Sequence, residues 1–136
     1  MAAITDLNEL LKTMSPKVKA DDYVFCTVTG AIKDYLTLEP IAFFHEDEGV
    51  TLVLKQQDAC NAGLPFDGIF KLITLTVHSS LEAVGLTAAV ASKLASYDIS
   101  ANVIAAYYHD HIFVQKEKVD IAMSALAEFS GESWVP

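Results

Sequence analysis

The sequence predicts an α+β fold of the ferredoxin-like (βαββαβ) type, built from two interlocked units. The first observation behind this prediction is the order of hydrophobic periodicities after residue 70, where a strand pattern, a helix pattern, two strand patterns and a second helix pattern follow one another. The second is composition: 52% of the 136 residues are hydrophobic and 20% are charged, so the chain has enough apolar material for a compact core.

The second half of the chain shows the pattern most clearly. Alternating side chains predict a strand over residues 70–78, and residues 102–108 and 112–115 predict a hairpin. A helix between them has its apolar residues on one face: Leu86, Val90, Leu94 and Tyr97. A last helix is predicted over residues 119–129. The order is β-α-β-β-α, which is five of the six elements of a ferredoxin-like unit.

The first half predicts a related unit in an altered order. Its elements are a helix over 5–14, strands over 23–29, 41–45 and 50–54, and a short helix over 56–62. A turn-rich segment at 64–68 is the one credible boundary, which gives units at 1–65 and 66–136. The second unit lacks a sixth element, which either residues 132–136 form or the first half lends. We favour a lent strand, residues 23–29.

The charge balance excludes several function classes. The formal net charge is −9 and no cluster of Lys and Arg offsets it, so binding to nucleic acid or to an anionic membrane surface is not expected. No apolar run approaches the ~20 residues of a membrane span. The first residues lack the basic and apolar regions of a signal peptide. We therefore expect a cytoplasmic protein.

The two cysteines, Cys26 and Cys60, do not form a CxxC pair. They could form one disulfide, but we favour two reduced thiols, with Cys26 buried in an apolar strand. No metal or other cofactor is expected. Because the sequence also has no GxSxG, P-loop or HExxH motif, we do not expect an enzyme.

A His-Asp-His stretch at residues 109–111 is the one grouping typical of a metal site. On an extended strand, His109 and His111 would share a face about 7 Å apart and could chelate an ion together. The trio, however, falls where the predicted hairpin reverses, and a third ligand would have to come from elsewhere. We favour a hairpin turn with exposed polar residues.

The segment between the first strand and helix of the second half is the candidate binding site. Ser79 and Glu82 match a capping box, which would make the segment only a helix start. Alternatively, free N–H groups at the helix N-terminus suit a carboxylate, and Gly85 would let a ligand approach the backbone closely. Asn102, at the start of the next strand, offers donors and acceptors that suit an amino acid.

Residues 84–104, VGLTAAVASKLASYDISANVI, resemble the ACT domain pattern, in which a glycine opens an apolar helix and a turn of the type x-I-x-x-N leads into the second strand. The resemblance is clearest over residues 70–129, and residues 48–54 are similar to the same group. The whole chain is similar to small proteins with two ACT-like units, related to the regulatory region of aspartate kinases.

This resemblance implies a non-catalytic regulatory protein that binds a small molecule, an amino acid, at the interface between paired units. It also implies a homodimer, with a metabolic enzyme as a further partner. By position, the family's ligand contacts fall on two segments: Ser79, Ser80, Leu81, Val84, Gly85 and Leu86, and then Ile99, Ser100, Asn102 and Val103. The alternative is a homo-oligomeric interaction module that regulates a partner enzyme without binding a ligand itself.

Overall fold

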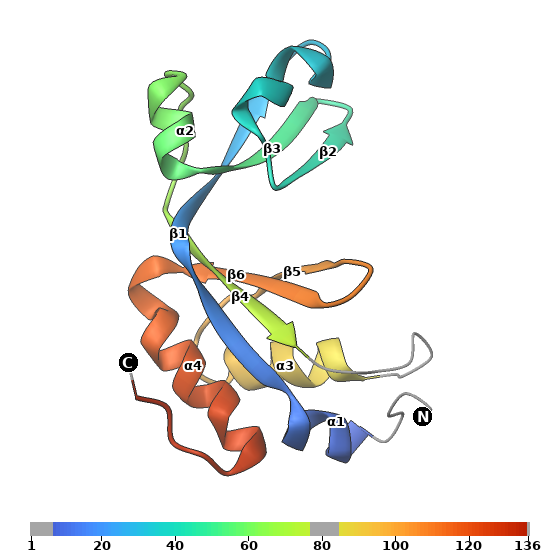
Figure 1. Cartoon of the computed structure of the whole chain (residues 1–136), viewed down its shortest axis with the longest axis vertical. Coiled ribbons are helices and arrows are strands. Elements are labelled where there is room, and N and C mark those ends of the chain that lie inside the picture. The colour runs from blue at the N-terminus through green and yellow to red at the C-terminus, as the bar shows by residue number, and fades with distance from the viewer. Residues whose placement is uncertain (1–6, 77–84, 136) are drawn as a thin grey trace. The chain divides into compact units, whose positions relative to one another are not determined.

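The computed structural model describes residues 7–76 and 85–135, which form two compact units (Figure 1). One, which we call the terminal unit, combines residues 1–19 with residues 71–136, and the other, the central unit, comprises residues 20–70. Strand β1 (Ser15–Val28) begins in the terminal unit and continues into the central unit. The predicted α+β fold with interlocked units is therefore confirmed.

The terminal unit has a ferredoxin-like arrangement of strands and helices. Its elements are α1 (Leu7–Thr13), the start of β1, β4 (Phe70–Thr76), α3 (Leu86–Ala95), β5 (Asn102–Ala105), β6 (Asp110–Gln115) and α4 (Val119–Ala127), with short 3-10 turns η2 (Lys116–Lys118) and η3 (Glu128–Ser130). The strand order is β1-β4-β6-β5. The start of β1, residues 15–19, thus occupies the place of the sixth element that the second half of the sequence lacks. A strand is lent as expected, but the expected residues 23–29 were wrong, because this part of β1 pairs with β3 in the central unit.

One apolar core holds the terminal unit together. Side chains from α1, α3 and α4 pack against alternate residues of β4 and β6, including Leu10, Leu11, Ile73, Leu75, Leu94, Ile112, Val114, Met123 and Leu126. Strands β5 and β6 form an antiparallel hairpin in which Asn102 pairs with Phe113 and Ile104 with His111. Helix α1 is therefore part of this core, although it precedes the rest of the unit by about sixty residues of chain.

The central unit is a smaller sheet of order β2-β3-β1. After β1 come the 3-10 helix η1 (Ile32–Leu38), strands β2 (Ala42–Glu46) and β3 (Gly49–Lys55), and helix α2 (Gln56–Asn61). The helix η1 was not predicted from the sequence, although Ile32, Tyr35 and Leu38 recur every third residue, as suits a 3-10 helix, and pack half-buried against the core of the central unit. With η1 in place, the unit follows the same order as the second half, and the altered order was wrong.

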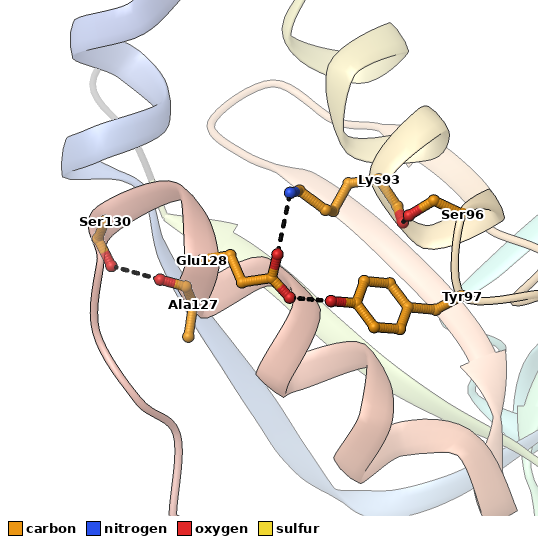
Figure 2. A network of polar contacts seen from close by, with 6 residues as sticks. All are labelled: Lys93, Ser96, Tyr97, Ala127, Glu128 and Ser130. Carbon is orange, nitrogen blue, oxygen red and sulfur yellow. Dashed lines mark hydrogen bonds and ion pairs between the residues drawn. The ribbon is translucent and has the colours of Figure 1, made fainter.

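A polar network fastens α3 to the end of α4 (Figure 2). The Glu128 carboxylate accepts a hydrogen bond from the Tyr97 hydroxyl and lies 3.2 Å from Lys93 Nζ. The same ammonium group stands 5.1 Å from the centre of the Phe129 ring. All these groups are at least partly exposed, so the network orients the two helices more than it stabilises the fold.

Among the described residues, none of the helices is both long and apolar enough to cross a membrane.

Candidate functional site

The predicted ligand contacts are only partly within the described residues. Ser79, Ser80, Leu81 and Val84 lie outside them, and so does the proposed capping box of Ser79 and Glu82. The remaining six predicted contacts fall into two groups at the two ends of α3: Gly85 and Leu86 at its start, and Ile99, Ser100, Asn102 and Val103 beyond its end.

Gly85 caps the N-terminus of α3 with φ of +98°, a conformation that favours glycine. The space beside it is already used by α1: a Cβ at this position would lie 3.2 Å from Leu7 Cδ2. Leu86 is 6% exposed and belongs to the core. In this conformation Gly85 lets the side chain of Leu7 approach the backbone closely, and the side chain of Leu86 points into the core of the terminal unit.

At the other end of α3, Ile99 and Ser100 line a surface hollow of about 350 Å³. Its wall is completed by Ala95, Asp98, Gln115 and Lys118. Lys118 Nζ donates a hydrogen bond of 2.7 Å to the carbonyl oxygen of Asp98. Ile99 is buried, so Ser100 is the predicted contact with a polar side chain on this hollow. The sequence did not single out Gln115, at the end of β6, or Lys118, at the end of η2, as residues of this hollow.

Asn102 and Val103 open strand β5. Asn102 is exposed, but its Nδ2 donates a hydrogen bond of 3.3 Å to the carbonyl oxygen of Phe113, its partner in the hairpin. Val103 is half-buried and packs against the core of the terminal unit. Asn102 therefore helps to fix the β5–β6 register, and its amide oxygen and second amide N–H are left for a ligand.

The two groups of predicted contacts are far apart along α3. The helix has ten residues, and at 1.5 Å per residue its ends are about 15 Å apart. This separation exceeds the length of a typical amino acid. A single amino acid therefore cannot reach both groups within one terminal unit.

The His-Asp-His stretch does not form the exposed tip of the hairpin. Tyr107 and Tyr108 occupy that position and are 86% and 80% exposed. His111 lies within β6, where it pairs with Ile104, and its Nδ1 is 3.0 Å from the Oγ1 of Thr74 on β4. The turn interpretation was therefore wrong for His111. It failed because the strand begins at Asp110, two residues earlier than predicted.

Within the part of the chain that the structure describes, no three His, Cys, Asp or Glu side chains are grouped in a way that could hold a metal ion. Cys26 and Cys60 are both free thiols, the first buried and the second exposed. A second hollow, of about 440 Å³, lies in the central unit beside Asp21, Lys55 and Cys60 and contains none of the predicted ligand contacts.

Models of the ACT domain match the chain twice, at residues 2–71 and 70–128. None of the curated proteins matches it. Among solved structures, the chain is similar to a Vibrio cholerae protein of unknown function described as a possible transport protein, with 65% identity, a TM-score of 0.86, and coverage of 91% of this chain and 95% of that one.

Two aspartate kinase structures share the fold at 10% identity. The regulatory subunit of the Thermus thermophilus enzyme, in its ligand-free form, has a TM-score of 0.60, with 86% of this chain and 97% of that chain covered. The Clostridium acetobutylicum aspartate kinase has a TM-score of 0.63, with 88% of this chain and 34% of that chain covered.

Proposed function

Because the chain belongs to the ACT domain family, we propose that it is a non-catalytic regulatory protein that binds a small molecule, in particular an amino acid. The target that it regulates would be a metabolic enzyme. The observation that carries the proposal is the hollow at the end of α3, because it combines two residues predicted as ligand contacts with polar groups of both signs.

The lining of the hollow suits a zwitterion. The Lys118 ammonium group can attract a carboxylate, the Asp98 carboxylate can attract an ammonium group, and Ser100 can both donate and accept a hydrogen bond. Lys118 already donates to the Asp98 carbonyl, which holds the two charged residues side by side at the rim. These groups would fix the orientation of the backbone part of an amino acid.

The position of Gly85 indicates that the ligand site would be shared between two copies of the chain. Since the N-terminus of α3 lies about 15 Å from the hollow, it can reach the ligand only if a second copy of the chain supplies it. The positive end of its helix dipole would then face the ligand carboxylate. Binding would therefore be linked to association of two copies.

A thermal-shift screen of the twenty amino acids tests this function. A ligand that binds the folded state raises the unfolding temperature in a concentration-dependent way. We expect one amino acid or a small group to do so, and light scattering in its presence to show a dimer at lower protein concentration. The Ser100→Arg variant should lose the shift, whereas Ser124→Arg, an exposed serine on α4, should keep it. Absence of any shift would contradict the proposal.

One observation favours the interaction module as a second candidate. Strand β2 ends the strand order of the central unit and exposes Phe43 and Phe44 at 47% and 70%, and Ile41, just before the strand, is 48% exposed. An exposed apolar edge strand is a typical surface for strand pairing. A stable dimer that shows no amino-acid shift and dissociates in the Phe44→Lys variant would support this candidate.

A further inference from the structure

A polar cluster lies on the face of the terminal unit's sheet that points away from its helices. Ile73 and Leu75 pack into the helical core, so Thr74 between them points to the opposite face. The same alternation on β6 places His111 opposite Ile112, and on β1 it places Lys19 opposite Val18. Three neighbouring strands thus direct polar side chains to one side of the sheet.

Thr74 and His111 form the centre of this cluster. The Thr74 hydroxyl is 3.0 Å from His111 Nδ1, and Thr74 is 5% exposed. This contact at Nδ1 holds the imidazole ring in one orientation and thereby fixes the position of Nε2. A hydroxyl held at this depth can exchange its role as donor or acceptor when the ring gains a proton.

His109 adds a polar atom whose bonding is incomplete. Its Nδ1 is buried, yet it has no hydrogen-bond partner among the residues that the structure describes. A buried nitrogen without a partner carries an unrecovered desolvation cost, so such a group calls for a ligand or another explanation. His109 directly precedes β6, its carbonyl oxygen accepts a hydrogen bond of 3.0 Å from the Ala106 N–H, and its ring lies near enough to His111 to act on that group.

The net charge of this cluster depends on the protonation of its two histidines. Within the described part of the chain, the titratable or charged groups that act on His111 are His109, Asp110 and Lys19. With both imidazoles protonated, Lys19, His109 and His111 carry three positive charges against the one negative charge of Asp110. With both imidazoles neutral, Lys19 and Asp110 cancel, so the positive surplus arises only when the two rings take up protons.

We propose that Lys19, Thr74, His109 and His111 form a binding site for a small oxyanion that carries two negative charges, of the phosphate type. The two imidazoles and the ammonium group would supply charge-assisted hydrogen bonds. The Thr74 hydroxyl would hold His111 in place. The site is separate from the hollow at Ser100 and does not depend on the proposed amino-acid function.

Binding at this site must be linked to proton uptake. Burial, followed by the charge of His109, lowers the pKa of His111, whereas Asp110 opposes this effect and Lys19 adds to it. The ring is therefore neutral at neutral pH when the site is empty. A bound dianion favours the charged ring, so it raises the pKa of His111 and binds more tightly as the pH falls.

Histidine NMR with inorganic phosphate as the probe tests the site. We expect phosphate to shift the imidazole resonances of both His109 and His111 and to raise the pKa of His111 by about one unit, as an adjacent opposite charge does. His45, exposed on β2 of the central unit, is the internal control and should not respond. Acetate, with a single charge, should have a much smaller effect than phosphate.

Variants separate binding from structure. Lys19→Gln removes an exposed charge and should weaken phosphate binding several-fold without altering the fold, whereas Lys33→Gln, an exposed lysine on η1, should leave it unchanged. Thr74→Val should remove the response of His111 in particular. If the chemical shifts of His109 and His111 titrate identically with and without phosphate, the proposal is wrong and the Thr74–His111 bond serves only to fix β6 against β4.

Discussion

The side chain of Leu7 lies against Gly85, so that a Cβ on the glycine would stand 3.2 Å from Leu7 Cδ2. The two residues are 78 positions apart, and they join the N-terminal helix α1 to the start of α3. Leu10, Leu11 and Met14 anchor α1 in the core, which holds Leu7 in this position. The glycine that the sequence assigned to ligand approach is therefore also required for packing within the unit.

Gly85→Ala should destabilise the protein. The positive φ alone costs about 1–3 kcal/mol for a residue with a Cβ, and the approach to Leu7 adds to that cost. Gly131→Ala is the matched control, because its φ is +74° and no described atom lies within 4 Å of its Cβ position. Urea unfolding should show a larger loss for Gly85→Ala than for Gly131→Ala.

A double-mutant cycle with Leu7→Ala isolates the contact itself. In the Leu7→Ala background the Cβ at residue 85 meets a smaller side chain, so Gly85→Ala should cost less than in the wild-type chain. Additive losses would show that Leu7 and Gly85 are not coupled and that backbone strain explains the whole effect.

Glu128→Gln should change the titration of Tyr97. The hydrogen bond to Glu128 is the main cause that raises the pKa of Tyr97, with smaller contributions from burial and from the Glu128 charge. Removing the charge should bring this pKa back toward the usual value of about 10. The measurement is the tyrosinate absorbance titration, in which the difference between wild type and Tyr97→Phe isolates Tyr97.

The same pair links stability to pH at both ends of the range. The hydrogen bond from Tyr97, followed by that from Lys93, lowers the pKa of Glu128 in the folded protein. The contribution of Glu128 to stability is therefore present above its pKa in the unfolded chain and is lost as the pH falls through its pKa in the folded protein. The raised pKa of Tyr97 gives the opposite pH dependence. Its contribution to stability is present below the pKa of Tyr97 in the unfolded chain and is lost as the pH rises through its pKa in the folded protein. Unfolding curves of Glu128→Gln should lack the acid-side loss that this pair causes in wild type.

The two thiols should react with a thiol reagent at very different rates. Cys60 is exposed, whereas Cys26 is 3% exposed and burial raises the pKa of its thiol. Since the thiolate is the reactive form, Cys60 should be modified rapidly and Cys26 only in the unfolded chain. The Cys60→Ser variant should show no fast phase. A chain in which neither thiol titrates under denaturing conditions would instead contain the disulfide.

Local patterns predicted most elements, but two were hidden from them. Alternation and helical stripes gave the strands and helices from Phe70 onward because these elements bury one face. The start of β1 was missed because Pro16 and alternating exposed Lys17 and Lys19 resemble a loop. The helix η1 was missed because it is short and its apolar residues, which pack against the core of the central unit, are only half-buried. In both cases tertiary packing, and not local preference, determines the structure.

The candidate site was predictable in sequence position but not in geometry. The resemblance placed contacts at both ends of α3, and their separation appears only when the helix length is fixed at ten residues. Lys118 and Thr74 gave no local signal, because each acquires its role from a partner distant in sequence: Asp98 for the lysine and His111 for the threonine. Such pairings depend on the order of strands in the sheet.

A site shared by two copies predicts that two inactive variants can complement each other. Thr87→Arg, at an exposed position in the first turn of α3, should block the helix start, and Ser100→Arg should block the hollow. Each variant alone should lose the amino-acid thermal shift, because every site contains one blocked end.

When the two variants are co-expressed, half of the dimers are mixed, and each mixed dimer contains one site in which both ends are unblocked. Titration should therefore recover about a quarter of the wild-type binding sites, as two-fold symmetry requires. Mixed dimers can be identified by mass spectrometry through the different variant masses. If they form and bind no ligand, the two ends of α3 do not meet at a shared site; if Thr87→Arg alone still binds, the hollow is sufficient within one chain.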